Sequence, residues 1–117
     1  MSIQIIKDQI SLAELRAAAK ESFGDMVKAV VDIEKEILAI GGGMHADAEQ
    51  KLLEQGSHQE NLWGINLYPD LPAGKRIQFE SLINIRPRQN NRSMEIEDAE
   101  LREKISGVVN KKVQWND

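Results

Sequence analysis

The stretch "MVKAVVDIEKEILAI", residues 26–40, decides the fold of this chain of 117 residues. It is rich in β-branched and aliphatic side chains, which favour strands, and a charged Glu34-Lys35 pair interrupts it. Two apolar runs separated by a short polar break are typical of a tight hairpin. The glycines at 41–43 follow directly, and we expect them to end the second strand. The sequence therefore predicts an antiparallel pair of strands here.

The segment before this hairpin carries the signals of a short strand and a helix. Residues 3–6, "IQII", suit a strand. Ser11 and Glu14 have the spacing of a capping box, in which the hydroxyl and the carboxylate each bind a main-chain N–H group. Apolar residues then recur at helical spacing as far as Phe23, and Gly24 is suited to end the helix.

The segment after the hairpin predicts two more strands and two more helices. A helix is expected over about 46–55, before Gly56. Strands are expected at 61–69 and 80–87, each ended by a proline that cannot donate to a ladder. The last helix should begin near Asp98, and the tail after about residue 110 is expected to fray.

The order of these elements is β-α-β-β-α-β-β-α, and the strands arrive in hairpin pairs. This order favours an α+β fold of two layers, in which a mostly antiparallel sheet of four to five strands carries three helices on one face. A length of 117 residues is typical of one domain. We therefore expect residues 1–117 to form a single compact domain.

Composition excludes several classes of function. The net charge of -4 and the pI of about 5.2 work against nucleic-acid binding, which needs a broad positive field. The chain has no cysteine, which removes disulfides and thiolate metal sites and fits a reducing compartment. No stretch approaches the roughly 18 apolar residues of a membrane span. We expect a cytoplasmic protein with no membrane contact.

The stretch "INIRPRQNNRS", residues 83–93, combines three arginines and three asparagines without any acid. Guanidinium groups bind carboxylates and phosphates through two parallel hydrogen bonds. Alternation along the strands predicted at 61–69 and 80–87 would bring polar side chains from both to one side, beside the loop. The predicted site for a small anionic or phosphate-containing ligand comprises Asn66, Asn84, Arg86, Arg88, Asn91, Arg92 and Ser93. In the alternative interpretation, Glu95, Glu97 and Asp98 pair with these arginines.

A second cluster consists of His45, Asp47 and Glu49. His45 and Glu49 have the spacing that shares one helix face, so His45 is a candidate general base assisted by Asp47 or Glu49. The spacing of two histidines around a glutamate that binds zinc is absent, and we expect no metal site and no cofactor. In the alternative interpretation, Asp47 caps the helix and Glu49 interacts with the helix dipole.

The chain resembles a family of small uncharacterised prokaryotic proteins known only as a domain of unknown function. The resemblance covers about residues 25–105 and rests on the motifs "HAD" (45–47), "WGIN" (63–66), "NIRP" (84–87) and "NRS" (91–93). It implies a compact α+β domain and no particular activity, substrate or cofactor.

Three functions therefore stay open on the residues alone. The first is the binding of a small anionic ligand by the loop at 83–93. The second is interaction with a protein partner or with another copy of the chain, through a sheet edge or face. The third is an enzyme, such as a hydrolase that uses His45 as its base. The sequence does not decide whether the chain is an enzyme.

Overall fold

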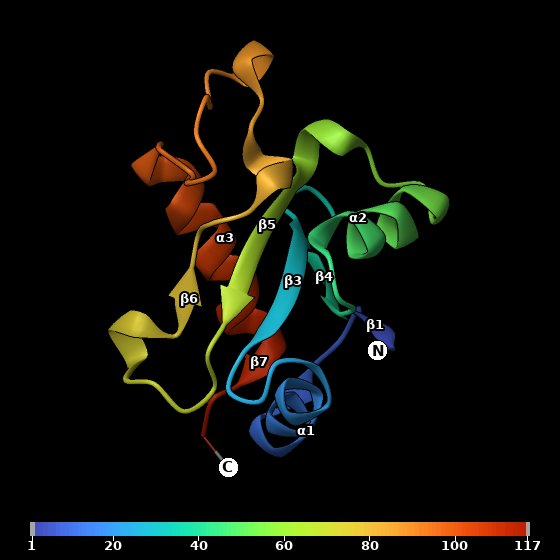
Figure 1. The fold of residues 1–117 in the computed structure, drawn as a ribbon, viewed down its shortest axis with the longest axis vertical. Helices are drawn as coiled ribbons and strands as arrows, with labels where there is room; N and C mark the ends of the chain where they lie inside the picture. The colour runs from blue at the N-terminus through green and yellow to red at the C-terminus, as the bar shows by residue number, and fades with distance from the viewer. Residues whose placement is uncertain (1, 117) are drawn as a thin grey trace.

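The computed structural model describes residues 2–116. Its main sheet has the strand order β1-β4-β3-β5-β6, and every neighbouring pair is antiparallel (Figure 1). The strands are β1 (Ile3–Ile6), β3 (Val27–Asp32), β4 (Ile37–Gly41), β5 (Leu62–Leu67) and β6 (Ile77–Gln78). The helices are α1 (Leu12–Ser22), α2 (His45–Glu54) and α3 (Ala99–Lys112). The predicted α+β class, with a mostly antiparallel sheet and three helices, is confirmed.

The hairpin of β3 and β4 forms as predicted, and Asp32 builds its turn. One carboxylate oxygen of Asp32 accepts hydrogen bonds from the main-chain N–H groups of Glu34 and Lys35, each at 2.9 Å. The other oxygen accepts from the Ser57 hydroxyl at 2.7 Å. Asp32 is buried, and these bonds satisfy its carboxylate.

The helices cover both faces of the main sheet, so the prediction of two layers with all helices on one face is wrong. Residues such as Ala29 and Val31 pack into one cluster with α1 and α3, whereas Val30 packs against Ala48 and Leu52 of α2 on the other face. The central strand β3 is apolar at consecutive positions because both of its faces are buried. None of the helices within residues 2–116 has the length and apolar character that a membrane span requires.

The prediction of a strand at 80–87 is wrong. The partner of β5 is β6, which pairs with it only at Asn66 and Leu67, and the chain then forms short 3-10 turns at Leu82–Asn84 and Pro87–Gln89. Ser81 begins the first turn by accepting a hydrogen bond from the N–H of Ile83. The apolar residues that suggested alternation there are partly exposed, because no ladder holds them against the sheet.

The end of the chain is also more ordered than the predicted fraying after residue 110. Helix α3 continues to Lys112, and β7 (Val113–Gln114) then pairs in parallel with β2 (Ile10–Ser11). Val113 is buried in the same cluster as Ile10, and this burial holds the strand in place.

Candidate functional site

Asn84 takes the place of a strand beside β5. Its Oδ1 accepts from the N–H of Gly64 at 2.8 Å, and its Nδ2 donates to the carbonyl of Gly64 at 2.9 Å. Nδ2 also lies 3.2 Å from the carbonyl of Met94. The side-chain amide therefore makes the two bonds that a neighbouring strand would make, and it is fully buried. Asn84 holds the fold of the segment and leaves no donor for a ligand.

Gly64 is required because this segment lies directly over it. A Cβ atom added at Gly64 would lie 2.5 Å from the Cβ of Ser81 and 3.1 Å from a side-chain carbon of Ile83. The first distance is far below van der Waals contact, and the second is tighter than an ordinary contact. The glycine in "WGIN" therefore allows the segment that begins at Ser81 to approach the sheet.

Asn91 organises the loop in a similar way. Its Nδ2 lies within hydrogen-bond distance of the carbonyls of Asn84, Ser93 and Glu95, at 2.8 to 3.1 Å. Its Oδ1 accepts from the N–H of Glu97 at 2.9 Å. The main chain of Asn91 pairs with that of Arg86 in an isolated antiparallel bridge. The amide of Asn91 is therefore used within the protein.

The guanidinium group of Arg86 is almost buried, with 9% of its side chain exposed. It donates to main-chain carbonyls, including those of Ile83 at 3.0 Å and Gln59 at 2.6 Å. It forms an ion pair with Glu49 at 3.3 Å and lies over the ring of Trp63 at 4.7 Å. Burial lowers the pKa of Arg86, and the charge of Glu49 acts in the opposite direction. Arg86 thus joins α2 to the start of β5.

The loop does hold an anion, and that anion is the carboxylate of Glu97. One oxygen of Glu97 accepts from the main-chain N–H groups of Arg92 and Ser93 at 3.1 Å each, and from the Ser93 hydroxyl at 3.0 Å. The bond from the Ser93 hydroxyl, followed by those from the two N–H groups, lowers the pKa of Glu97. The alternative interpretation of the sequence paired Glu97 with the arginines of the loop. In the structure Glu97 does bind the loop, through the main chain of Arg92 and through Ser93.

The other acids after the loop have different partners. Asp98 caps α3 by accepting from the N–H of Glu100, and Glu95 lies 3.9 Å from Arg102. Arg88 is exposed and lines a shallow cavity of about 380 Å³ near Gln59. Of the seven residues predicted to bind a ligand, the structure gathers six around this self-contained loop and places Asn66 elsewhere.

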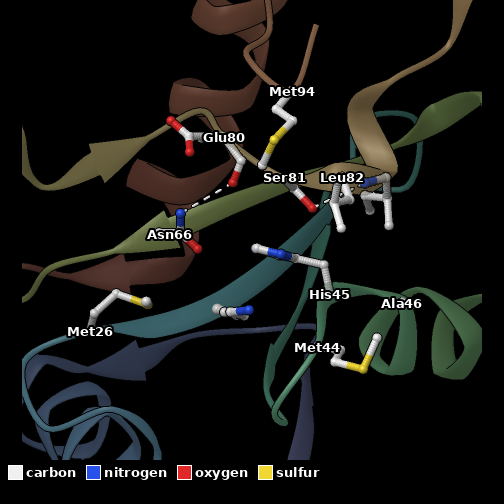
Figure 2. Close-up of a pocket in the computed structure, with 11 residues that line it drawn as sticks. Met26, Met44, His45, Ala46, Asn66, Glu80, Ser81, Leu82 and Met94 are labelled. Atoms are coloured by element: carbon white, nitrogen blue, oxygen red, sulfur yellow. Dashed lines mark hydrogen bonds between the residues drawn. The ribbon is translucent and has the colours of Figure 1, made fainter.

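Asn66 lies in a pocket of about 440 Å³ between the start of α2 and the segment after β6 (Figure 2). Lys28 and Asn66 are directly opposite each other on β3 and β5 and share the face that α2 covers. His45, the first residue of α2, lies beside them. The walls are mostly apolar and include Leu82 and Ala46.

Three methionines surround this pocket, although they come from distant parts of the sequence. Met26 precedes β3, Met44 precedes α2, and Met94 follows the loop, and Figure 2 shows them on three sides of the pocket. Methionine side chains are flexible and polarisable, so they adapt to apolar ligands of different shape. Sequence reasoning did not find this group, or Lys28, because only the pairing of β3 with β5 brings them together.

His45 is buried, and its Nε2 lies 2.8 Å from the carbonyl of Ile65. Because a carbonyl only accepts, Nε2 carries the proton and donates it. Burial lowers the pKa of His45 below 6.5 and the charge of Lys28 lowers it further, whereas the hydrogen bond to Ile65 acts in the opposite direction. The ring is therefore neutral at pH 7.

The two acids predicted to assist His45 make other contacts. Glu49 pairs with Arg86, and Asp47 is exposed in the first turn of α2. Asp47 does not cap the helix, because the N-cap is Met44, whose side chain makes no capping bond. Among residues 2–116, the long helices α1 and α3 have side-chain caps and α2 does not. The N–H of Asp47 bonds to the carbonyl of Met44, but no side chain caps the start of α2, which keeps a positive partial charge at the edge of the pocket.

Buried polar side-chain atoms without a partner are uncommon in folded proteins, and the described residues contain two. One is the Nε1 of Trp63, and the other is the Oδ1 of Asn66. The Nδ2 of Asn66 donates to the carbonyl of Glu80 at 3.2 Å, which fixes the orientation of the amide. Figure 2 shows the amide oxygen of Asn66 on the side toward His45, although it lies outside hydrogen-bonding geometry.

Comparison with known proteins extends the resemblance seen in the sequence. No curated protein and no solved structure matches the chain. A family model described as "Protein of unknown function (DUF5674)" matches residues 4–112, a range that includes the pocket and the loop. Because this match covers nearly the whole sequence, the chain belongs to the DUF5674 family.

Proposed function

We propose that this chain is a binding protein for a small anionic ligand with an apolar body, and that the ligand lies in the pocket between α2 and the segment after β6. The observation that carries this proposal is the combination of one cation, Lys28, with a helix start that no side chain caps, at the edge of a mostly apolar pocket. Helix starts attract anions through their free N–H groups. The pocket volume of about 440 Å³ suits a small molecule.

The loop at 83–93, which the sequence favoured as the anion site, does not support the same role. Its asparagine amides bind the main chain, Arg86 pairs with Glu49, and Glu97 occupies the cradle at Ser93. A ligand there would have to displace a carboxylate that is tethered within the same segment, which is a strong competitor. The pocket needs no such displacement.

The experiment is an NMR titration of the protein with hexanoate, hexyl phosphate and 1-hexanol. Either anion is expected to shift the amide signals of Ala46 and of the Asn66 side chain, whereas the neutral alcohol binds more weakly. Lys28→Met should weaken anion binding by about tenfold, because it removes the charge and keeps an apolar chain. Lys104→Met is the matched control, since Lys104 is exposed on α3 away from the pocket.

The proposal is wrong if neither anion moves these signals at millimolar concentration. It is also wrong if Lys28→Met and Lys104→Met change the affinity to the same small extent.

A second candidate is a protein partner that inserts an apolar side chain into the same pocket. The observation in its favour is the exposed rim, where Leu82 is 69% and Met44 58% exposed. Large exposed apolar residues around a cavity are typical of interaction sites. Leu82→Asp should abolish such an interaction, measured by sedimentation for self-association and by pull-down for other partners. An unchanged result for this variant would remove the candidate.

A further inference from the structure

The charges around the pocket indicate which kind of anion it accepts. Lys28 is the one cationic side chain among the described residues that line it, and no arginine does so. Proteins that bind phosphate groups in closed sites typically use arginine forks or several cations, because the phosphate of an ester carries close to two charges at pH 7. One lysine matches one negative charge.

Lys28 also contacts an aromatic ring. Its Nζ lies 5.2 Å from the centre of the Phe23 ring, in cation–π geometry. Glu80 is the acid at the pocket, and Figure 2 shows its carboxylate directed away from His45. Lys28 and Glu80 are the two charged side chains among the described residues that line the pocket, so the lining offers no positive charge beyond that of Lys28.

The polar side chains of His45 and Asn66, which form the floor of the pocket, do not add a second positive charge. His45 is held in its neutral form by burial and by Lys28, and its Nε2 proton is already donated to Ile65. Asn66 presents its oxygen on the side of His45, and an oxygen repels an anion. A dianion would thus lose its hydration shell without gaining matching charges.

The apolar part of the pocket can bind the hydrocarbon part of a ligand. Met26, Met94 and Leu82 line it beside the polar floor, so a hydrocarbon chain attached to the anionic group can be buried against them. A monocarboxylate offers one charge, two acceptor oxygens and no further polar groups. The helix start of α2 supplies main-chain N–H donors that suit a carboxylate as well as they suit a phosphate.

We propose that the ligand of this pocket is a monocarboxylate with an apolar chain or ring, and not a phosphate ester. This inference rests on the proposed function, because it names the class of anion that the same pocket binds. The selectivity follows from the single cation, Lys28, and from the apolar walls.

The test compares dissociation constants for hexanoate and hexyl phosphate by isothermal titration calorimetry at pH 7.5. The two molecules carry the same six-carbon chain, and at this pH the phosphate ester is largely dianionic. Hexanoate is expected to bind at least about tenfold more tightly, and inorganic phosphate is expected not to bind in the pocket. Equal or tighter binding of hexyl phosphate would overturn the inference and leave the proposed function standing.

A gain-of-charge variant provides the converse test. Leu82→Arg places a second cation at the exposed rim, where 69% of the leucine is accessible, so the fold should tolerate it. The preference for hexanoate should then narrow or reverse. A preference that stays the same in Leu82→Arg would contradict the role of charge in the selectivity. If neither anion binds to the wild-type protein, both the inference and the proposed function fail.

Discussion

Replacing Asn84 by alanine should destabilise the protein strongly, although the residue is only one amide in a segment without regular structure. The change removes three hydrogen bonds, two with Gly64 and one with Met94. Each buried bond contributes about 1 kcal/mol net, so the expected cost is about 3 kcal/mol. In a domain of this size that cost lowers the melting temperature by roughly 12 °C.

The assay is urea unfolding monitored by circular dichroism, supported by hydrogen exchange of the Gly64 amide. Exchange at Gly64 should accelerate in Asn84→Ala, because its N–H loses its acceptor. Asn90→Gly is the matched control: Asn90 is exposed and has a φ of 60°, which glycine adopts without strain. A cost below about 1 kcal/mol for Asn84→Ala, or a cost equal to that of the control, would refute the role of Asn84 as a substitute strand.

Four further predictions concern other parts of the structure. Gly64→Ala should cost about 1–3 kcal/mol in urea unfolding, because the added Cβ would lie 2.5 Å from the nearest side chain, whereas equal stability would show that the segment adjusts freely. Arg86→Met should cost about 3–5 kcal/mol because it leaves Glu49 buried without its partner, and the double variant with Glu49→Met should recover most of this loss. Glu97→Gln should accelerate hydrogen exchange of the two main-chain N–H groups that its carboxylate holds, and unchanged exchange would contradict the cradle. The pKa of His45 is lowered from 6.5 in the folded protein, so the unfolded chain binds the proton at a higher pH than the folded chain does. The free energy of unfolding should therefore fall as the pH drops from about 7 to 5.5. His45→Gln should remove this pH dependence of stability.

The sequence predicted those parts of the fold whose signals are local. The capping box of Ser11 and Glu14 is present with both bonds, and the hairpin of β3 and β4 forms around its polar break. These features depend on residues within a few positions of one another, so the pattern is sufficient to predict them. The apolar run in β3 also carried a signal that was missed, because consecutive buried valines indicate a strand covered on both faces.

The candidate site was less predictable because its residues meet only through pairing between distant segments. The strand assigned to 80–87 failed since Asn84 makes the ladder bonds with its side chain, a substitution that no periodicity reveals. Lys28 lies within the predicted hairpin, and none of its neighbours in the sequence indicates a binding role. It becomes a pocket residue only because β3 pairs with β5 and places it opposite Asn66.

The pairing of β2 with β7 has a consequence for how the chain folds. It joins residues about 100 positions apart and so closes a very long loop. Closing this loop has a high entropic cost unless the intervening elements have already folded. The hairpin of β3 and β4 joins near neighbours and needs no such closure. During synthesis on the ribosome the hairpin can therefore form early, whereas β2 can pair only after β7 has been synthesised. We expect the small parallel sheet of β2 and β7 to be the last element to form, after the main sheet and the helices have packed.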